Sequence, residues 1–335
     1  MESAGGLARE LAAVAADTDF SGVAVAHDGD RRVVEVVAGS EDRANGRPIE
    51  IGTRFATASA TKGLTALTVA GLAERGELAL DTPVRDLVGD DLPRVEPAVT
   101  IEDLLGHTSG VGDYLDEEEL DDIDDYLMDT PVHLLTEPDA YLPMVAAPAQ
   151  VSPPGSRFAY NNGGYVMLSI AVERAVRRSF YDVVDECVLG PAGMRDSGFF
   201  RSDRLPPGTA LGYLADGRSN IFHLPVRGAG DGGAYATVAD VDALWDALFA
   251  GRLVSPPMLE RLTAPRRDAP AEGLRYGLGF WIAADRPTVM LEGMDAGVSF
   301  RSALDPSSTC GYTVISNTSA GAWPLVKVLD NWIGT

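Results

Sequence analysis

Apolar and polar positions divide the chain into two strand-rich ends. Residues 3–16 have apolar side chains at helical spacing, and the runs FSGVAVAHDGD and RRVVEVVAGSED meet at the turn Asp28-Gly29-Asp30, which is typical of a hairpin. In the last third, YGLGFWIAA, PTVMLE, GVSFRSALD and CGYTVISN are β-rich runs separated by Gly, Asp or Pro, and they predict four strands. The final segment AWPLVKVLDNWIG predicts an amphipathic helix.

The middle of the chain has a different pattern. Residues 59–75 have helical apolar spacing that Gly76 ends, and from about 80 to 225 the chain is rich in Pro, Asp and helical patterns. We therefore expect an α+β fold, in which strands from both ends share one antiparallel sheet flanked by helices. Residues 1–58 and 228–335 would form the sheet domain and residues 59–227 a mostly helical inserted domain, with the active site in the cleft between them.

Composition and charge exclude several kinds of partner. The chain has 335 residues, 45% of them hydrophobic, and a formal net charge of −23. A sizeable core is expected, whereas nucleic acid and anionic membranes would be repelled. The sequence has no apolar run long enough to span a membrane and no basic segment typical of a secretory signal, so we expect a cytoplasmic protein if Met1 is the natural start. Cys187 and Cys310 fit no metal spacing and are interpreted as free thiols.

Lysine is rare in this chain. Of its 27 Lys and Arg residues only Lys62 and Lys327 are lysine, and Lys62 lies three residues after Ser59 at the start of the predicted helix 59–75. Side chains at i and i+3 share one helix face, so the amine can reach the hydroxyl. A Ser hydroxyl becomes nucleophilic when a neighbour takes its proton, and Lys can do so where its pKa is lowered, whereas Arg cannot.

A second segment, SPPGSRFAYNNGGYVML, carries Tyr160 and Asn162 about 100 residues later. S-x-x-K followed by Y-x-N resembles the serine β-lactamase and penicillin-binding-protein superfamily, in particular its class C β-lactamase, D-aminopeptidase and family VIII esterase branch. Three further segments resemble that branch: LLGHTSGV at 104–111, GAGDGGAYATVADVDAL at 228–244 and YGLGFW at 276–281.

The resemblance implies a β-lactamase/DD-peptidase-like fold and a role for each matching residue. Ser59 would be the acylated nucleophile, and Lys62 and Tyr160 would handle its proton as a coupled pair. Asn162 would orient Lys62 and hydrogen-bond the substrate. This branch of the family needs no metal, and no cofactor is expected.

The third motif departs from the family. Where the family has K-T-G or H-x-G, this chain has Leu291-Glu292-Gly293, so the Gly is kept and the basic residue is missing. The backbone N–H of Met294 would form an oxyanion hole with that of Ser59, and a backbone donor tolerates many side chains. The cation that receives a substrate carboxylate is lost. Glu292 would favour neutral or cationic substrates if it faces the cleft, but the opposite face of the sheet is equally compatible with the sequence.

We therefore predict a serine hydrolase that forms a Ser59 acyl-enzyme and most readily hydrolyses an ester or simple amide, with lactams less favoured. An acyltransferase, a D-amino peptidase or a β-lactamase could use the same site. A catalytically inactive, ligand-binding member is the rival from another class, and the presence of Ser59, Lys62 and Tyr160 argues against it. The oligomeric state is not predicted.

Two other features have simpler interpretations. His107, in the GHTSG loop, is interpreted as structural, and the four histidines show no pairing or metal spacing. The acidic run 113–125 is interpreted as a solvated face, with a lid that steers cationic substrates as the alternative.

Overall fold

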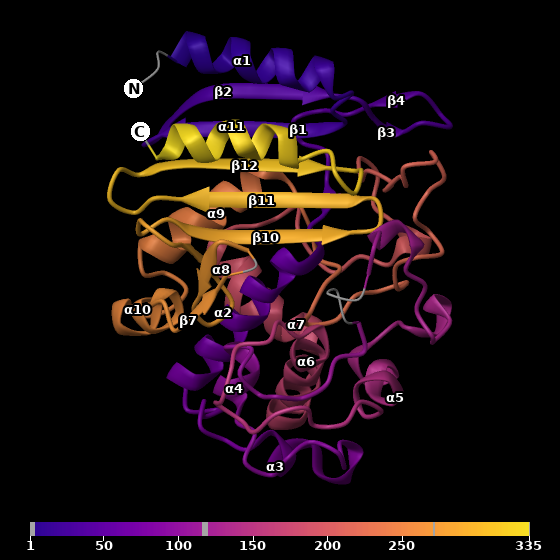
Figure 1. Cartoon of the computed structure of the whole chain (residues 1–335), viewed down its shortest axis with the longest axis vertical. Coiled ribbons are helices and arrows are strands. Elements are labelled where there is room, and N and C mark those ends of the chain that lie inside the picture. The colour runs from indigo at the N-terminus through magenta and orange to yellow at the C-terminus, as the bar shows by residue number, and fades with distance from the viewer. Residues whose placement is uncertain (1–3, 116–119, 271, 335) are drawn as a thin grey trace.

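The computed structural model describes residues 4–115, 120–270 and 272–334, and an antiparallel sheet of eight strands crosses it (Figure 1). The strand order is β2-β1-β12-β11-β10-β9-β8-β7. The strands are β1 Gly22–Asp28, β2 Arg31–Ala38, β7 Arg267–Ala269, β8 Leu274–Tyr276, β9 Trp281–Ala283, β10 Val289–Asp295, β11 Val298–Leu304 and β12 Cys310–Ser316. Because β1 pairs with β12 along its whole length, the two ends of the chain share one sheet, as predicted.

The turns agree with the sequence except in one run. Asp28 pairs with Arg31, which confirms the predicted hairpin. The run YGLGFWIAA, however, is divided between β8 and β9, and Gly279 between them has a φ of +89°. A Cβ at Gly279 would lie 2.2 Å from the Cβ of Ala66, so the chain bends here because it passes directly against a helix. The short pairs β3 Ser40–Asp42 with β4 Arg47–Pro48, and β5 Phe55–Ala56 with β6 Tyr235–Ala236, lie outside the large sheet.

Helices cover both faces of the sheet. Figure 1 shows α11 (Trp323–Ile333) in front of the sheet and α9 (Val238–Phe249) behind it, while α1 (Ala4–Asp17) packs on β2 and α11. Alternate residues of β1 serve the two faces: Ala24 is buried with α1 and α11, whereas Val23 and Val25 are buried with the helices of the other face.

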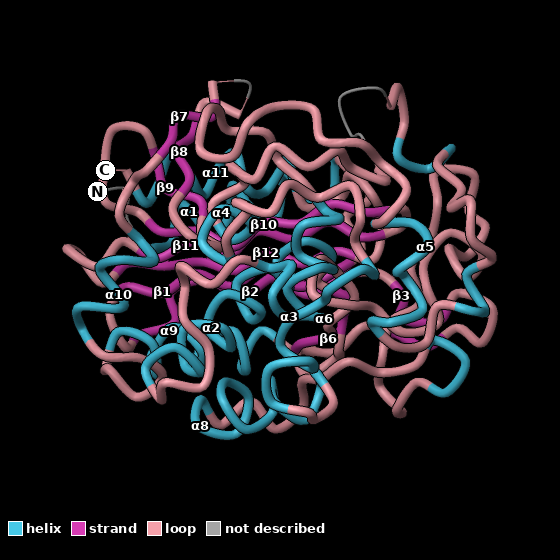
Figure 2. Tube along the Cα trace, turned by 90° about the horizontal axis from the view of Figure 1, so that it is seen from below, coloured by secondary structure: helices cyan, strands magenta, loops and turns pink. Residues whose placement is uncertain are grey.

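The helix α2 (Thr61–Glu74), preceded by the 3-10 turn η1 (Ala58–Ala60), connects the sheet to the helical region. All its residues from Thr61 to Leu72 are buried, as expected for a helix surrounded by protein. The other helices are α3 Val84–Val88, α4 Ile101–Leu105, α5 Leu142–Val145, α6 Asn162–Val176, α7 Phe180–Val184, α8 Gly190–Ala192 and α10 Pro256–Thr263. Long loops connect many of them, as Figure 2 shows from the end of the molecule that carries α3.

One large group of packed apolar side chains joins the sheet and the helices. It contains Val23 and Phe300 from strands together with Leu67 and Val166 from α2 and α6. The division into a sheet domain and an inserted domain of residues 59–227 therefore stays a prediction. Within the described residues, no helix is both long and apolar enough to cross a membrane.

Replacement of Gly279 by Ala tests the close approach of this loop to α2. Gly279→Ala adds a left-handed φ penalty and a clash with Ala66, and we expect it to lower the free energy of unfolding by about 2–4 kcal/mol. Gly46 also has a positive φ, but a Cβ at that position would meet no atom within 4 Å, so Gly46→Ala should cost only about 1 kcal/mol. Urea unfolding followed by circular dichroism measures both, and equal losses would contradict the close contact.

Candidate functional site

Ser59 lies in a strained turn directly before α2. The preceding Ala58 has a φ of +45°, a left-handed conformation that is unfavourable for a residue with a Cβ atom. Two hydrogen bonds hold the turn, because Thr57 Oγ1 donates to the Ala234 carbonyl at 3.0 Å and the Ala234 N–H donates to Thr61 Oγ1 at 3.1 Å. The turn places Ser59 on the wall of a cleft.

Lys62 is buried, with 2% of its surface exposed, and its amine contacts three parts of the chain. Its Nζ donates hydrogen bonds to Ser59 Oγ at 2.8 Å, to Asn162 Oδ1 at 2.7 Å and to the Asp231 carbonyl oxygen at 2.9 Å. The structure thus brings together Ser59 and Lys62, as their spacing predicts, and places Asn162 where it can orient the amine.

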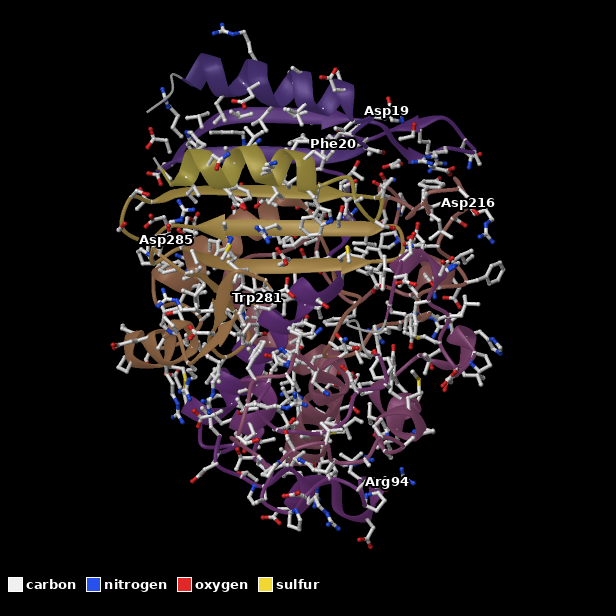
Figure 3. All side chains as sticks on the ribbon, in the orientation of Figure 1. Asp19, Phe20, Arg94, Asp216, Trp281 and Asp285 are labelled. Carbon is white, nitrogen blue, oxygen red and sulfur yellow. The ribbon has the colours of Figure 1, made fainter. Side chains whose placement is uncertain are left out.

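Tyr160 lies close to this amine. Lys62 Nζ is 4.8 Å from the centroid of the Tyr160 ring. That ring stacks on Trp281 of β9 at 5.7 Å, and Figure 3 shows Trp281 near the centre of the molecule. The three residues expected to carry the chemistry are therefore neighbours, although Tyr160 is about 100 residues from the other two in the sequence.

His107 supports this arrangement. Its Nδ1 accepts a hydrogen bond from the Asn161 N–H at 3.1 Å, and its ring packs 4.5 Å from the Tyr160 ring, centroid to centroid. Burial, followed by the positive charge of Lys62, lowers the pKa of His107 well below its usual value, so the ring is neutral. These contacts agree with the structural interpretation of His107.

Gly293 brings strand β10 against the nucleophile. A Cβ at this position would lie 2.4 Å from the Thr57 carbonyl oxygen and 2.7 Å from the Ser59 nitrogen. Only a residue without a side chain allows so close an approach. The retained Gly of the third motif therefore has a steric reason.

The register of the sheet determines which edge of β10 the Met294 N–H faces. The Asp305 N–H bonds to the Cys310 carbonyl at 2.9 Å, so Asp305 directs its backbone groups toward the strand β12 side. Successive residues of a strand direct their backbone groups to alternate edges, so Phe300, five residues earlier, bonds to Gly293 of β10 instead. Met294, one residue on, must point its N–H to the other edge of β10. The partner strand β9 pairs with only Val289 and Met290 on that edge, and β10 also contacts η1, which carries Ser59.

Comparison with known proteins identifies the family of the chain. Residues 7–327 match the family model described as Beta-lactamase. The chain belongs to the β-lactamase family. The β-lactamase-like fold and the serine-hydrolase class that the sequence predicts are thereby confirmed.

Individual relatives of this β-lactamase-family protein are named for different activities. The chain is 32% identical to esterase EstB of Burkholderia gladioli, over 72% of this chain and 69% of that protein. It is 28% identical to penicillin-binding protein 4* of Bacillus subtilis over 80% of this chain but 60% of that protein. A penicillin-binding protein structure from Bacillus halodurans superposes with a TM-score of 0.88 at 37% identity, covering 96% of this chain and 99% of the other.

Glu292 does not face the cleft of this β-lactamase-family site. It forms an ion pair with Arg301, and Arg301 Nη1 lies 2.8 Å from Asp330 of α11. Because neighbouring residues of a strand point to opposite faces and Gly293 faces Ser59, Glu292 must face α11. The sequence left two orientations of Glu292 open, and in the structure its side chain points away from the cleft. The substrate-binding role that the first orientation would give Glu292 is therefore corrected.

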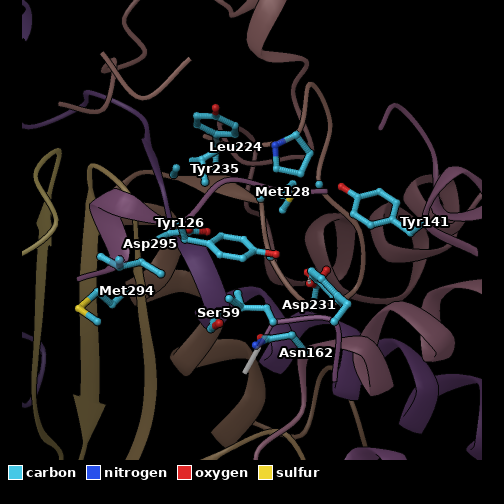
Figure 4. Close-up of a pocket in the computed structure, with 18 of the residues that line it drawn as sticks. Ser59, Tyr126, Met128, Tyr141, Asn162, Leu224, Asp231, Tyr235, Met294 and Asp295 are labelled. Atoms are coloured by element: carbon cyan, nitrogen blue, oxygen red, sulfur yellow. Dashed lines mark hydrogen bonds between the residues drawn. The ribbon is translucent and has the colours of Figure 1, made fainter. Parts of the chain in front are cut away.

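The cleft beside Ser59 encloses about 730 Å³, counting the solvent at its mouth (Figure 4). Its apolar and aromatic lining includes Tyr114, Tyr126, Met128, Tyr141, Leu224 and Tyr235, and its polar lining includes Asn162, Asp231 and Asp295. Sequence reasoning singled out only Asn162 of these. Asp231 lies in the quoted GAGDGG segment, but nothing in that segment indicated that its side chain lines the cleft.

The acidic run contributes to the cleft through its uncharged members. Tyr114, Leu115 and Ile123 of the run, and Tyr126 directly after it, line the cleft, whereas residues 116–119 lie outside the described residues. Asp113 accepts hydrogen bonds from the N–H groups of Asn162 and Gly163 at the start of α6, at 2.5 and 2.8 Å. This carboxylate therefore holds the segment that carries Asn162.

The titration of Asp113 gives a stability prediction. Burial raises the pKa of Asp113 from 3.8 to about 6, although the backbone N–H groups and Lys62 oppose the rise. Between these values the folded protein binds a proton that the unfolded chain has lost, so stability falls as pH rises through this window. We expect the free energy of unfolding of the wild type, relative to Asp113→Asn, to decrease from pH 4 to pH 7 in urea titrations. A constant or increasing difference would contradict this expectation.

Proposed function

We propose that this protein hydrolyses an ester or a simple amide through an acyl-enzyme on Ser59. The observation that carries the proposal is the 2.8 Å hydrogen bond between the buried Lys62 amine and Ser59 Oγ on the wall of the cleft. An inactive ligand-binding member would not need a buried amine held against a hydroxyl, and burial of such a group is unfavourable without partners.

Acylation begins when Ser59 Oγ attacks the substrate carbonyl carbon and its proton passes to the Lys62 and Tyr160 pair. The carbonyl oxygen becomes an oxyanion, which accepts hydrogen bonds from the N–H groups of Ser59 and Met294. As the bond to the leaving alcohol or amine breaks, Tyr160 gives that group a proton. The acyl group then remains on Ser59.

Deacylation reverses these roles with water. Water attacks the acyl carbon, its proton passes to the Tyr160 and Lys62 pair, and the same N–H groups hold the oxyanion. When the ester bond to Ser59 breaks, Oγ recovers a proton from the pair and the carboxylic acid leaves. No other reactant is needed.

The lining of the cleft favours an uncharged ester or amide and disfavours a substrate that carries a carboxylate beside the scissile bond. Among the described residues that line it there is no Lys, Arg or His. Penicillin-type lactams and peptides that end in a free carboxylate would therefore lack a counter-charge. The net charge of −23 likewise favours a small molecule over nucleic acid or an anionic membrane as partner.

Covalent labelling tests the nucleophile. Ser156 provides the control, because its exposed hydroxyl donates a hydrogen bond to the Pro153 carbonyl. We expect a fluorophosphonate to add its mass to the wild type and to Ser156→Ala, but not to Ser59→Ala. Turnover of p-nitrophenyl butyrate by Ser59→Ala should fall about 10³-fold or more. Intact-protein mass spectrometry and absorbance measure these outcomes. A wild type that neither labels nor turns over an ester would refute the proposed function.

The chain's two lysines provide a matched test of the base. Lys62→Arg keeps the positive charge but cannot release a proton, and we expect kcat for p-nitrophenyl butyrate to fall about 10²- to 10⁴-fold. Lys327, the other lysine, is exposed on α11, and Lys327→Arg should retain the wild-type rate. If both variants fold, as shown by circular dichroism, and Lys62→Arg stays within about threefold of the wild type, Lys62 is not the base.

A further inference from the structure

Tyr160 lies in a loop, so contacts with other parts of the molecule must hold its side chain in place. Residues 157–161 have no regular secondary structure, and α6 begins only at Asn162. In the proposed mechanism the Tyr160 phenol gives a proton to the leaving group, and such a transfer needs the donor within hydrogen-bond reach. Whatever fixes the direction of this ring therefore bears on the rate of the reaction.

His107 holds the backbone on both sides of Tyr160. Its carbonyl oxygen accepts a hydrogen bond from the Ala159 N–H at 2.9 Å, and its Nδ1 accepts the bond from the Asn161 N–H. His107 itself has a φ of +53°, a conformation that few residues with a Cβ atom adopt. These bonds fix the point from which the Tyr160 side chain starts, whereas the plane of its ring depends on ring contacts.

Trp281 presents a flat surface to the Tyr160 ring. The centroids of the two rings are 5.7 Å apart and their planes differ by 15°, which is an offset-stacked arrangement that aromatic pairs favour. The His107 ring, by contrast, is tilted by 39° to the Tyr160 ring. Rotation of the phenol ring would break the stack on the indole, so this contact sets the plane of the ring.

Trp281 is itself held by the sheet. It is buried, with 8% of its surface exposed, and it pairs in register with Met290 of β10 and with Tyr276 of β8. The Tyr276 ring meets the indole edge-on, with centroids 4.7 Å apart and planes at 86°. Met290 lies four residues before Met294, the proposed oxyanion donor, on the same strand. The indole thus connects the proton donor to the strand that carries the oxyanion donor.

We propose that Trp281 is a positioning residue, which holds the Tyr160 ring beside the Lys62 amine for protonation of the leaving group. Lys62 Nζ lies 4.8 Å from the centroid of that ring. Ser59 and Asn162 bond directly to the same amine, so their geometry does not depend on the stack. The inference rests on the proposed function and concerns one step of it. In that step the bond between the acyl carbon and the leaving oxygen breaks, and this oxygen takes the phenol proton and departs as an alcohol.

Two butyrate esters that differ in their leaving group test this assignment. p-Nitrophenolate leaves as a stable anion, whereas the oxygen of ethanol must take up a proton as it leaves, so the ethyl ester depends more on a positioned acid. The ethyl-to-aryl ratio is kcat/KM for ethyl butyrate, followed in a pH-stat, divided by kcat/KM for p-nitrophenyl butyrate. We expect Trp281→Leu to lower this ratio about 10- to 100-fold, as a small misplacement of a reacting group does. Trp281→Phe keeps an aromatic face and should stay within about threefold of the wild-type ratio.

Trp245→Leu distinguishes positioning from the loss of a buried tryptophan. Trp245 of α9 is 4% exposed, its ring packs on Phe249 and Phe280, and its Nε1–H donates to Ser302 Oγ at 2.8 Å. We expect Trp245→Leu to affect both esters alike and to keep the ratio. An equal fall of the ratio in both Leu variants would mean that packing in general sets it, and would overturn the proposal. If circular dichroism shows that Trp281→Leu does not fold, Trp281→Met takes its place, because methionine adapts to irregular space.

A double-mutant cycle shows whether Trp281 acts through Tyr160. Tyr160→Phe removes the phenol proton, so adding Trp281→Leu to that variant should change the ethyl-to-aryl ratio by less than about threefold. If the ratio falls as far in the Tyr160→Phe background as in the wild type, Trp281 acts by another route and the proposal is wrong.

The outcomes separate this inference from the proposed function. If the wild type labels with fluorophosphonate and turns over both esters, yet Trp281→Leu keeps the ratio, the positioning inference alone is wrong. It is also wrong if the wild type turns over the p-nitrophenyl ester but not the ethyl ester, because no positioned acid then serves the alcohol. If the wild type neither labels nor turns over any ester, the proposed function is wrong and the inference falls with it.

Discussion

The hydrogen bonds of the buried Lys62 amine join three segments that are far apart in the sequence. They connect Ser59 in η1 directly before α2, Asn162 at the start of α6 and the Gly-rich segment at Asp231. A buried amine that lacked these acceptors would destabilise the fold by several kcal/mol. The interaction that satisfies Lys62 structurally is therefore also the one that sets the catalytic geometry, so errors in packing the helices against the sheet would disturb both together.

Small residues make this convergence sterically possible. A Cβ at Gly63 would meet Leu291 of β10 at 2.3 Å, and one at Gly230 would meet the Tyr165 carbonyl oxygen of α6 at 2.3 Å. Gly293 allows the same approach beside Ser59. The backbones of strand, loop and helix thus come closer than side chains would permit. This is why the motifs that surround the nucleophile are rich in Gly.

Sequence reasoning was strongest where a feature depends on neighbouring residues. The hairpin and the Ser59–Lys62 pair follow from local periodicity, whereas Tyr160 joined the site only through the family resemblance, because its approach to Lys62 depends on tertiary packing. The orientation of Glu292 stayed open because a shift of one residue in register exchanges the faces of a strand. Tyr114 and Tyr126 lie in loops, where no periodicity indicates which side chain enters a cleft.

The altered third motif helps to explain why the cleft is acidic. Leu291 occupies the position of the family's basic residue, and alternation puts it on the same face of β10 as Gly293. It is 4% exposed and packs against Gly63, so an apolar contact fills the space of the missing cation. With no Lys, Arg or His among the described residues that line the cleft, Asp231 and Asp295 supply its acidic groups.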